Sequence, residues 1–472
     1  MGLCELRLNG AEVGNTHLLP GWTDYRKRVY VHTFDVTDRL VQGENVLGCI
    51  LGAGWFAGYF GPFGDKGYYG HDAWFSATLE IEYQNGIRET IRTDSTWTGN
   101  AGPILASDIL MGESYDARKE VPNWDSPGFD DKNQWLEVAL IRNDEQLPEK
   151  IEPYPGAPVC TVAEIPAQSV AEPKPSIYVF DLGQNMVGVV RLKVNVPSGT
   201  ELVLKHGEML NADGTVYTEN LRSAKAVDRY IAKGGGEEVW QPRFTFHGFR
   251  YVEISGFPAK PAVDVVTGQV WMSGVRETAV FECSDEKVNR LFKNIQWGFR
   301  GNYLEVPTDC PQRDERLGWT GDTQMFIRSA SYLADIRPFY KKWLVDLHDA
   351  QHENGGYPDM APFMGRMSYA CAAWADAGII CPHVLWKAYG DTSFIRDWWP
   401  QMKKFMALIC TDDNRHNGPD AVSYGDWLHF NSETPVRLIG LAYRAYDADL
   451  MAEMAAALGE TADATHFSVE VA

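Results

Sequence analysis

Hydrophobic and polar positions change their period once along the chain, close to residue 284. Before this point, short runs of alternating apolar and polar residues are separated by Gly, Pro and Asn-Gly turns, a pattern typical of antiparallel strands. After it, apolar residues recur at helical spacing, first at Val288, Leu291, Phe292, Ile295 and Phe299. The pattern predicts β domains followed by an all-α domain.

The β region divides into two predicted antiparallel β-sandwich domains, residues 1–148 and 149–275. The Pro-rich stretch from Leu147 to Pro158 has the composition of a linker and sets the boundary. In the first domain the predicted strands are Arg28–Phe34, Asn45–Leu51, Ser76–Tyr83 and Glu89–Arg92. In the second they are Ile177–Phe180, Val187–Val196, Glu201–His206, Asp228–Ala232 and Arg250–Ile254.

The third domain, residues 276–472, is predicted to be a series of α-hairpins. Helices are predicted at 285–302, 321–334, 337–351, 367–389, 393–410 and 435–458, with another beginning at Thr461. Helix pairs that cannot bury their own faces must stack on neighbours or close into a ring. About six helices make an open half-ring, so we expect a barrel that is only partly present and a domain cut short at its C-terminus. Uncovered inner faces would favour association between copies.

Charge and hydropathy exclude several partners. The net charge is −21 and no basic block occurs, which argues against nucleic acid and anionic membranes as partners. No apolar stretch is long enough to cross a bilayer. The chain begins with strand-like residues and no apolar leader, so we expect a cytoplasmic location, with a lost leader as the alternative.

The sequence offers no pattern for a metal or an organic cofactor, and we predict neither. The eight cysteines are scattered, without C-x-x-C pairs or histidines at ligand spacing, as expected for reduced thiols. The turn Asn211–Gly214 lacks the alternating acids of a calcium loop, and no phosphate-binding glycine motif is present. Cys310 has no local pattern of a thiol enzyme, so we do not expect a cysteine nucleophile.

The most informative segment runs from Asp309 to Asp322. It holds four carboxylates, two arginines and a tryptophan, interrupted by Pro311, Gly318 and Gly321. These interruptions disfavour a solvated helix and indicate a shaped loop that carries ionisable groups. Thr320 is then expected to cap the next helix, whose apolar stripe is Phe326, Ala330 and Leu333.

Two acids of this loop have distinct expected roles. Glu315 is flanked by Asp314, Arg313 and Arg316, and a partly dehydrated carboxyl among like charges could keep a proton and deliver it to a leaving oxygen. We therefore choose Glu315 as the general acid. Asp322, in the first turn of a helix, would stay ionised and accept bonds from hydroxyls or arginine. The alternatives are a purely structural ion-pair network and plain helix capping by Asp322.

Three tryptophans stand beside acids at predicted helix ends: Trp319, Trp374 and Trp427. A flat ring next to carboxylates suits the apolar face of a sugar with its hydroxyls held at the edge. Packing in a core remains the alternative for each ring.

The segment from Val306 to Asp322 resembles the hallmark of bacterial α-L-rhamnosidases of glycoside hydrolase family 78. Gly21–Arg26 with Asp38–Gly54 resembles the family's N-terminal β domain, and Phe180–Asn185 with Phe244–Tyr251 resembles its next one, so the likeness covers almost the whole chain. The resemblance implies β-sandwich modules leading into an (α/α)6 barrel. It implies that Glu315 is the general acid and that the substrate-binding residues are Asp309, Arg313, Trp319, Asp322, Trp374 and Trp427.

The resemblance also implies an inverting mechanism on terminal α-L-rhamnose of a glycoside or oligosaccharide, with no metal or cofactor. Inversion needs a second carboxylate, about 6.5–9.5 Å from the acid, to activate water. In the family that base is a late glutamate, accompanied by a histidine, and we expect both to be missing from this chain. Asp376 and Asp426 are the candidates to replace it.

Three functions therefore remain open. The first is an inverting α-L-rhamnosidase, and the second is a fragment that binds rhamnosides without cleaving them. The third, another (α/α)6 enzyme such as a polysaccharide lyase, would need a base and a neutralising group beside a uronic acid.

Overall fold

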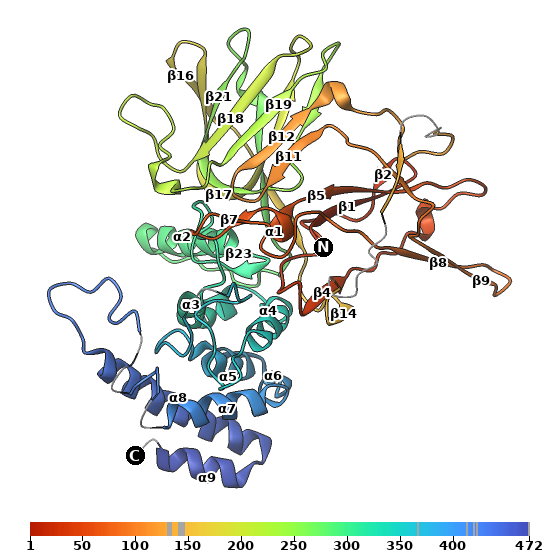
Figure 1. Cartoon of the computed structure of the whole chain (residues 1–472). Coiled ribbons are helices and arrows are strands. Elements are labelled where there is room, and N and C mark those ends of the chain that lie inside the picture. The colour runs from red at the N-terminus through yellow and green to blue at the C-terminus, as the bar shows by residue number, and fades with distance from the viewer. Residues whose placement is uncertain are drawn as a thin grey trace.

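The computed structural model describes residues 1–129, 135–139, 147–365, 368–411, 414–418, 421 and 423–470. A β-rich part occupies the first 273 residues and a helical part follows, as Figure 1 shows from red to blue. Among the described residues, no helix combines the length and the apolar character needed to span a bilayer. The predicted order of β domains followed by helices is confirmed.

The N-terminal region consists of short strands in several small sheets around one helical turn, α1 (Gly54–Ala57). The central sheet has the order β2-β1-β5, and β8 and β9 form a separate hairpin. The strands are β1 (Leu3–Leu8), β2 (Ala11–Glu12), β3 (Thr16–His17), β4 (Arg28–Val31), β5 (Leu47–Gly52), β6 (Tyr59–Phe60), β7 (Asp65–Lys66), β8 (Thr78–Glu82), β9 (Arg88–Arg92), β10 (Thr98–Gly99), β11 (Ile104–Asp108), β12 (Gly112–Asp116), β13 (Leu136–Glu137) and β14 (Lys150–Pro153).

One large sheet dominates the second β region. Its path is β11-β12-β19-β18-β21-β17-β22-β15-β3, and β16 and β20 pair with β17 outside this path. The pairs are antiparallel except for β12 with β19, which are parallel. The strands are β15 (Val159–Pro166), β16 (Ser169–Lys174), β17 (Ile177–Val194), β18 (Glu201–Gly207), β19 (Val227–Ile231), β20 (Glu238–Trp240), β21 (His247–Ser255) and β22 (Val266–Ser273).

Strands β3, β11 and β12 come from the first 148 residues, so the large sheet draws on both predicted β domains. The boundaries at 148 and 275 themselves stay predictions. The Pro-rich stretch predicted as a linker contains β14, which pairs in parallel with β4. The linker prediction was therefore wrong for Lys150–Pro153, because a two-stranded pairing tolerates proline at the end of a strand.

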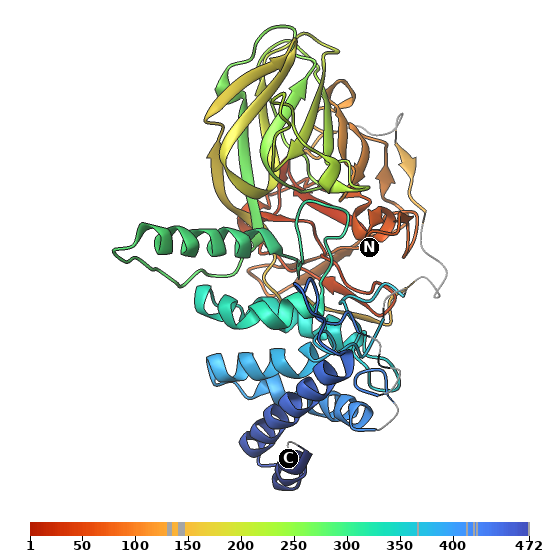
Figure 2. The ribbon, with the colours of Figure 1, turned by 90° about the vertical axis from the view of Figure 1, so that its left-hand side faces the viewer.

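The helical region begins with α2 (Glu286–Asn302), which lies beneath the large sheet (Figures 1 and 2). A hairpin of two-residue strands, β23 (Tyr303–Leu304) and β24 (Val306–Pro307), leads into the acid-rich loop. The remaining helices are α3 (Thr320–Leu333), α4 (Arg337–Asp349), α5 (Ala377–Tyr389), α6 (Ser393–Arg396), α7 (Trp399–Ile409), α8 (Val436–Leu458) and α9 (Thr461–Glu470).

Two predicted helices differ from the structure. The helix predicted at 367–389 begins only at Ala377, and Ala370 and Ala373 before it have positive φ angles of 56° and 71°, which helical backbone excludes. The helix predicted at 393–410 is broken into α6 and α7, because Pro400 starts a new helix at its first turn. Along α2, only the C-terminal end of the apolar stripe is covered: Phe299 is buried, whereas Leu291 is exposed.

A buried ionic cluster fixes the N-terminal region to the helices. Lys342 of α4 is 1% exposed, and its ammonium lies 3.0 Å from Glu305 Oε1 and 2.9 Å from Asp346 Oδ2. The same ammonium donates to the carbonyl of Trp22, and the Trp22 N–H donates to Glu305 Oε1 at 3.0 Å. Burial raises the pKa of Asp346 to about 7. Glu305 lies between β23 and β24, so this cluster holds the hairpin that leads into the acid-rich loop between the N-terminal region and α4.

Candidate active site

The acid-rich loop closes on itself between β24 and α3. The Asp309 N–H donates to the Leu317 carbonyl at 3.2 Å, and the Leu317 N–H donates to Asp309 Oδ1 at the same distance. The seven residues between them form a compact turn at the junction of the β and helical regions. The predicted shaped loop is confirmed, and its ends are tied by Asp309.

The glycines of the loop permit close approach of neighbouring groups. A Cβ on Gly318 would lie 2.2 Å from the carbonyl oxygen of Ala361, and one on Gly321 would lie 2.7 Å from the indole of Trp374. Thr320 was predicted to cap α3, but α3 begins at Thr320 itself. Its hydroxyl donates instead to the carbonyl of Asp359 at 2.8 Å, because that backbone packs against the helix start.

Arg316 anchors the loop, and among the described residues no carboxylate lies within hydrogen-bond range of it. Its guanidinium is buried and donates to the carbonyls of Ile109, Phe246, Gln312 and Arg313 at 2.6–3.0 Å. Burial lowers its pKa to about 10. These four carbonyls belong to three parts of the chain, so Arg316 joins the loop to both β regions and has a structural role.

Glu315 lies at the surface of the loop with its side chain 18% exposed. Its Oε2 is 3.0 Å from Nη2 of Arg313 and 3.2 Å from Nη1 of Arg222. Asp314, next to it, is buried and accepts bonds from the backbone N–H and hydroxyl of Ser223, at 3.1 and 2.6 Å. Part of the predicted ion-pair network therefore exists, and it leaves the Glu315 carboxyl accessible.

Two further acids of the site have raised pKa values. Burial raises the pKa of Asp309 to about 6, and the nearby charges of Glu315 and Asp322 act in the same direction. Loss of water around Asp322 raises its pKa as well, with Glu315 contributing. The backbone N–H groups at the helix start lower the pKa of Asp322, as predicted, but desolvation outweighs their contribution. The ionised state of Asp322 stays a prediction.

Tyr424 connects the three predicted tryptophans. Its ring centroid lies 4.6 Å from that of Trp374, 5.9 Å from Trp427 and 6.1 Å from Trp319. The Tyr424 hydroxyl donates to Asp359 at 2.9 Å, and Asp359 is fully buried. Trp319 and Trp374 are half-buried, whereas Trp427 is 63% exposed, so none is a plain core residue.

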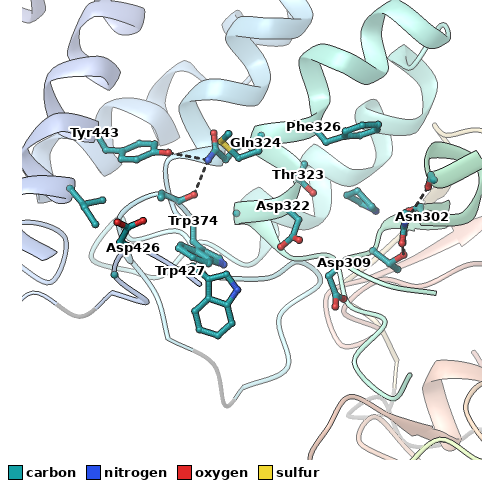
Figure 3. Close-up of a pocket in the computed structure, with 18 of the residues that line it drawn as sticks. Asn302, Asp309, Asp322, Thr323, Gln324, Phe326, Trp374, Asp426, Trp427 and Tyr443 are labelled. Atoms are coloured by element: carbon teal, nitrogen blue, oxygen red, sulfur yellow. Dashed lines mark hydrogen bonds between the residues drawn. The ribbon is translucent and has the colours of Figure 1, made fainter. Parts of the chain in front are cut away.

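A cavity of about 770 Å³ opens beside this aromatic group. Four predicted site residues line it: Asp309, Asp322, Trp374 and Trp427. Figure 3 shows Asp322 at the start of α3 between Asp309 on one side and Asp426 and Trp427 on the other. Gln324 and Tyr443 form the far wall, where the Gln324 amide donates to the Ala373 carbonyl at 3.1 Å.

The other three predicted residues stand next to this cavity and do not line it. Glu315 lies next to Asp309, and carboxylate oxygens of the two side chains are within 4.8 Å of each other. Arg313 reaches both carboxylates, at 3.6 Å from Asp309 Oδ2. Trp319 contacts the site through Tyr424.

Asp376 and Asp426, the two candidate replacement bases, lie in different surroundings. Asp376 is fully buried, with Oδ1 2.7 Å from Nε2 of His416 and Oδ2 accepting the Ala373 N–H at 2.5 Å. Asp426 lines the cavity and accepts a bond from the Thr434 hydroxyl at 2.8 Å. Asp376 is thus a support for the loop that carries Trp374, and it faces no substrate.

Two clusters of metal-type ligands occur in the part of the chain that the structure describes. In the first, Asp309, Cys310 and Glu315, burial raises the pKa of the Cys310 thiol to about 12, which disfavours a thiolate ligand. In the second, the rings of His206 and His247 stack at 4.3 Å and approach the same carboxylate, Asp228, which suits hydrogen bonding better than chelation.

Sequence reasoning missed Tyr424, Arg222 and Ser223. Tyr424 is three residues before Trp427, and its position beside a glycine and an acid was a usable signal. Arg222 and Ser223 belong to a β region far from the loop in sequence, so no local pattern identifies them.

Models of known protein domains match all three regions of the chain, and the three models belong to one family. A model of the bacterial α-L-rhamnosidase N-terminal domain matches residues 1–159, and one of the concanavalin-like domain matches 171–272. A model of the bacterial α-L-rhamnosidase 6 hairpin glycosidase domain matches residues 276–471. Two β regions joined to a helical-hairpin region, with three carboxylates lining a cavity of the helical region, match the architecture of a family of modular glycoside hydrolases.

Individual relatives agree. An α-L-rhamnosidase of Streptomyces avermitilis is 48% identical over 98% of this chain and 44% of its own length, and one of Formosa agariphila is 37% identical over 97% and 50%. The solved structure of the Streptomyces avermitilis α-L-rhamnosidase complexed with L-rhamnose has a TM-score of 0.96 at 47% identity, covering 100% of this chain and 45% of that one.

The solved α-L-rhamnosidase of Dictyoglumus thermophilum has a TM-score of 0.93 at 35% identity, over 100% of this chain and 52% of that one. This chain therefore belongs to the bacterial α-L-rhamnosidases, glycoside hydrolase family 78. It spans about half the length of the curated relatives it matches.

Proposed function

We propose that this chain binds the rhamnosyl group of terminal α-L-rhamnosides and hydrolyses the glycosidic bond with inversion, with Glu315 as general acid. The observation that carries the proposal is the convergence of Asp309, Asp322 and Trp374 on one cavity, with Glu315 at its edge. Membership of the α-L-rhamnosidase family and the likeness to a structure that holds L-rhamnose support the choice of sugar.

The residues divide the chemistry between them. Asp309 and Asp322 supply acceptors for the sugar hydroxyls, and the tryptophan rings cover its apolar face. Arg313 pairs with Asp309 and Glu315 from beside the cavity. Glu315 gives its proton to the leaving oxygen as the glycosidic bond breaks. The low exposure of Asp309, at 7% of its side chain, strengthens each hydrogen bond it accepts from the sugar.

Inversion also requires a second carboxylate that activates water on the opposite face of the ring, about 6.5–9.5 Å from the acid. Asp376 cannot serve, because it is buried against His416. Among the described residues that line the cavity, Asp426 is the one carboxylate without a role in holding the sugar. Asp426 is therefore the base candidate that the described part of the chain offers.

The alternative is a protein that binds rhamnosides without cleaving them. It is favoured by the position of Asp426, which comes from the loop before α8 and is already bonded to Thr434. In that case the acids and tryptophans would hold the sugar, and no group would activate water.

A proton NMR time course with 4-nitrophenyl α-L-rhamnoside tests the proposal. We expect free L-rhamnose whose β anomer forms first, and loss of turnover in Asp426→Asn with binding retained. Without turnover, a melting temperature raised by L-rhamnose but not by D-mannose supports the binding alternative. Neither turnover nor a sugar-specific shift would contradict both functions.

A further inference from the structure

The short segment 219–224 of the large β region reaches the acid-rich loop from the opposite domain. It contains the 3-10 turn η4 (Glu219–Leu221), whose last residue is buried. The Asp314 N–H donates to the Leu221 carbonyl at 3.4 Å, and Ser223 gives two bonds to the Asp314 carboxylate. The segment is thus locked against the residue that precedes Glu315.

Arg222 stands between these two contacts in an unfavourable backbone conformation. Its φ is 57° and its ψ is −117°, a combination that a residue with a Cβ rarely adopts. Such strain persists where surrounding contacts over-determine the backbone, and it often marks a functional position. Here the strained residue is an arginine whose side chain reaches Glu315.

The Arg222 guanidinium lies 3.2 Å from Glu315 Oε2 and 3.8 Å from Asp314 Oδ1. Its side chain is 49% exposed, and it does not line the cavity. It therefore contacts Glu315 from outside the cavity of the proposed rhamnosyl site. A second cation, Arg313, contacts the same oxygen of Glu315 at 3.0 Å from within the loop.

We propose that Arg222 is a positioning residue that the β domain contributes to the acid: it holds the Glu315 carboxyl and stabilises the negative charge that forms there as the proton leaves. Interactions aimed at developing charge are stronger in the transition state than in the ground state, so they accelerate the chemical step. The effect grows with the extent of proton transfer. It is therefore largest for basic leaving groups and small for those that depart without a proton. This inference rests on the proposed function of Glu315.

The kinetic test compares two substrates in Arg222→Met. At the acidic plateau of each pH profile, we expect kcat to fall about tenfold with methyl α-L-rhamnoside, whose alkoxide needs a proton, and less than about twofold with the 4-nitrophenyl substrate. Arg222→Lys should recover part of the loss because it keeps the charge. Equal losses on both substrates, or no loss, would overturn the proposal.

Arg229→Met is the matched control. Arg229 belongs to β19 of the same β region, is also 49% exposed, pairs with Glu201 at 2.9 Å and does not line the cavity. It should leave both rates unchanged, so an effect shared by both variants would point to general disturbance of the sheet and would count against Arg222.

A second measurement does not depend on turnover. Carbodiimide with a glycine ester labels protonated carboxyls. Peptide mapping then measures the labelling of Glu315 separately from that of the other acids. Removing a cation that favours the carboxylate should make Glu315 react several-fold faster in Arg222→Met at pH 6, but not in Arg222→Lys or Arg229→Met. Unchanged labelling would overturn the role of Arg222. A chain that hydrolyses nothing would contradict the proposed function, and the labelling would still decide whether Arg222 acts on Glu315.

Discussion

At the scale of single residues, the site depends on carboxyls that the fold holds away from water. Asp309 ties the ends of its loop, and one of its oxygens has no hydrogen-bond partner among the described residues. Arg313 Nη2 lies 3.6 Å from that oxygen, and Asp309 lines the cavity, so under the proposed function a sugar hydroxyl would supply the missing bond. A buried carboxylate oxygen that lacks a hydrogen-bond partner until a ligand binds reduces the stability of the ligand-free protein.

Replacing Asp309 should therefore stabilise the protein in a pH-dependent way. Its folded pKa of about 6 is above the ordinary value of about 3.9, so the folded state binds a proton more readily between these pH values. The Asp309 contribution lowers stability as pH rises from about 4 to 6 and stays unfavourable above that. We expect Asp309→Asn to raise the free energy of unfolding by about 1–3 kcal/mol at pH 7.5 and by much less at pH 4.5.

Urea unfolding at both pH values measures this difference. Asp335→Asn is a control of opposite sign, because the hydrogen bond from Arg337 lowers the pKa of Asp335. It should lose stability by a similar amount at both pH values, because a lowered pKa keeps its stabilising contribution above the ordinary value of about 3.9 and loses it only at lower pH. An Asp309→Asn protein whose gain is the same at both pH values would contradict the account of a desolvated carboxyl.

At the scale of elements, patterns local in sequence were predicted well and contacts between distant segments were not. The change of period near residue 284 correctly placed α2, α3, α4 and α8 within a few residues. The interruption of the acid-rich segment by proline and glycine correctly indicated a loop. The start of α5 was missed because small apolar residues before Ala377 continue the helical pattern while their backbone turns away from it.

The candidate site shows the same division. Glu315, Asp309 and Asp322 were found because they share one loop with a recognisable pattern. Arg222 and Tyr424 reach the site through pairing of the large sheet and through the loop before α8, and a single sequence holds no record of those contacts. The sequence indicated the effect of the helix start on Asp322 but not the larger effect of desolvation, because desolvation depends on residues far along the chain.

The junction of α3 with the Trp374 loop gives a test at this scale. A methyl group on Gly321 would meet the Trp374 indole, so Gly321→Ala should displace the ring while leaving the helix formed. We expect L-rhamnose affinity to fall about tenfold or more, as measured by calorimetry, with an unchanged circular dichroism spectrum.

Gly236→Ala, in the turn before β20, is the matched control. Its added Cβ meets nothing within 4 Å and Gly236 does not line the cavity, so L-rhamnose affinity should stay unchanged. If Gly321→Ala binds rhamnose as well as the unchanged chain, the Trp374 ring is not part of the sugar site.

At the scale of the whole molecule, the site exists because three regions are fixed against one another. Arg316 joins the acid-rich loop to both β regions, and Lys342 joins the helices to the N-terminal region. One apolar core, running from Leu3 to Phe467, continues through the same junction. We therefore expect loss of a junction contact to affect the whole chain.

Lys342→Met tests this expectation. The substitution leaves the buried carboxyls of Glu305 and Asp346 without their cation, and breaking a buried pair in this way costs about 3–5 kcal/mol. Thermal unfolding followed in parallel by circular dichroism and tryptophan fluorescence should shift by the same amount in both signals. Lys341→Met, at the exposed neighbouring position, should change little, and a Lys342→Met protein as stable as this control would contradict the assigned role of the cluster.

The most direct test of the central claim is the hydrolysis of 4-nitrophenyl and methyl α-L-rhamnosides by the unchanged chain and by Glu315→Gln, with Glu353→Gln as an exposed control. The account predicts that Glu315→Gln loses a factor of about 100 or more on the methyl substrate, as removal of a general acid should, and clearly less on the 4-nitrophenyl substrate. Full activity of Glu315→Gln on the methyl substrate would show that another group delivers the proton, and Glu315 would not be the acid of this site.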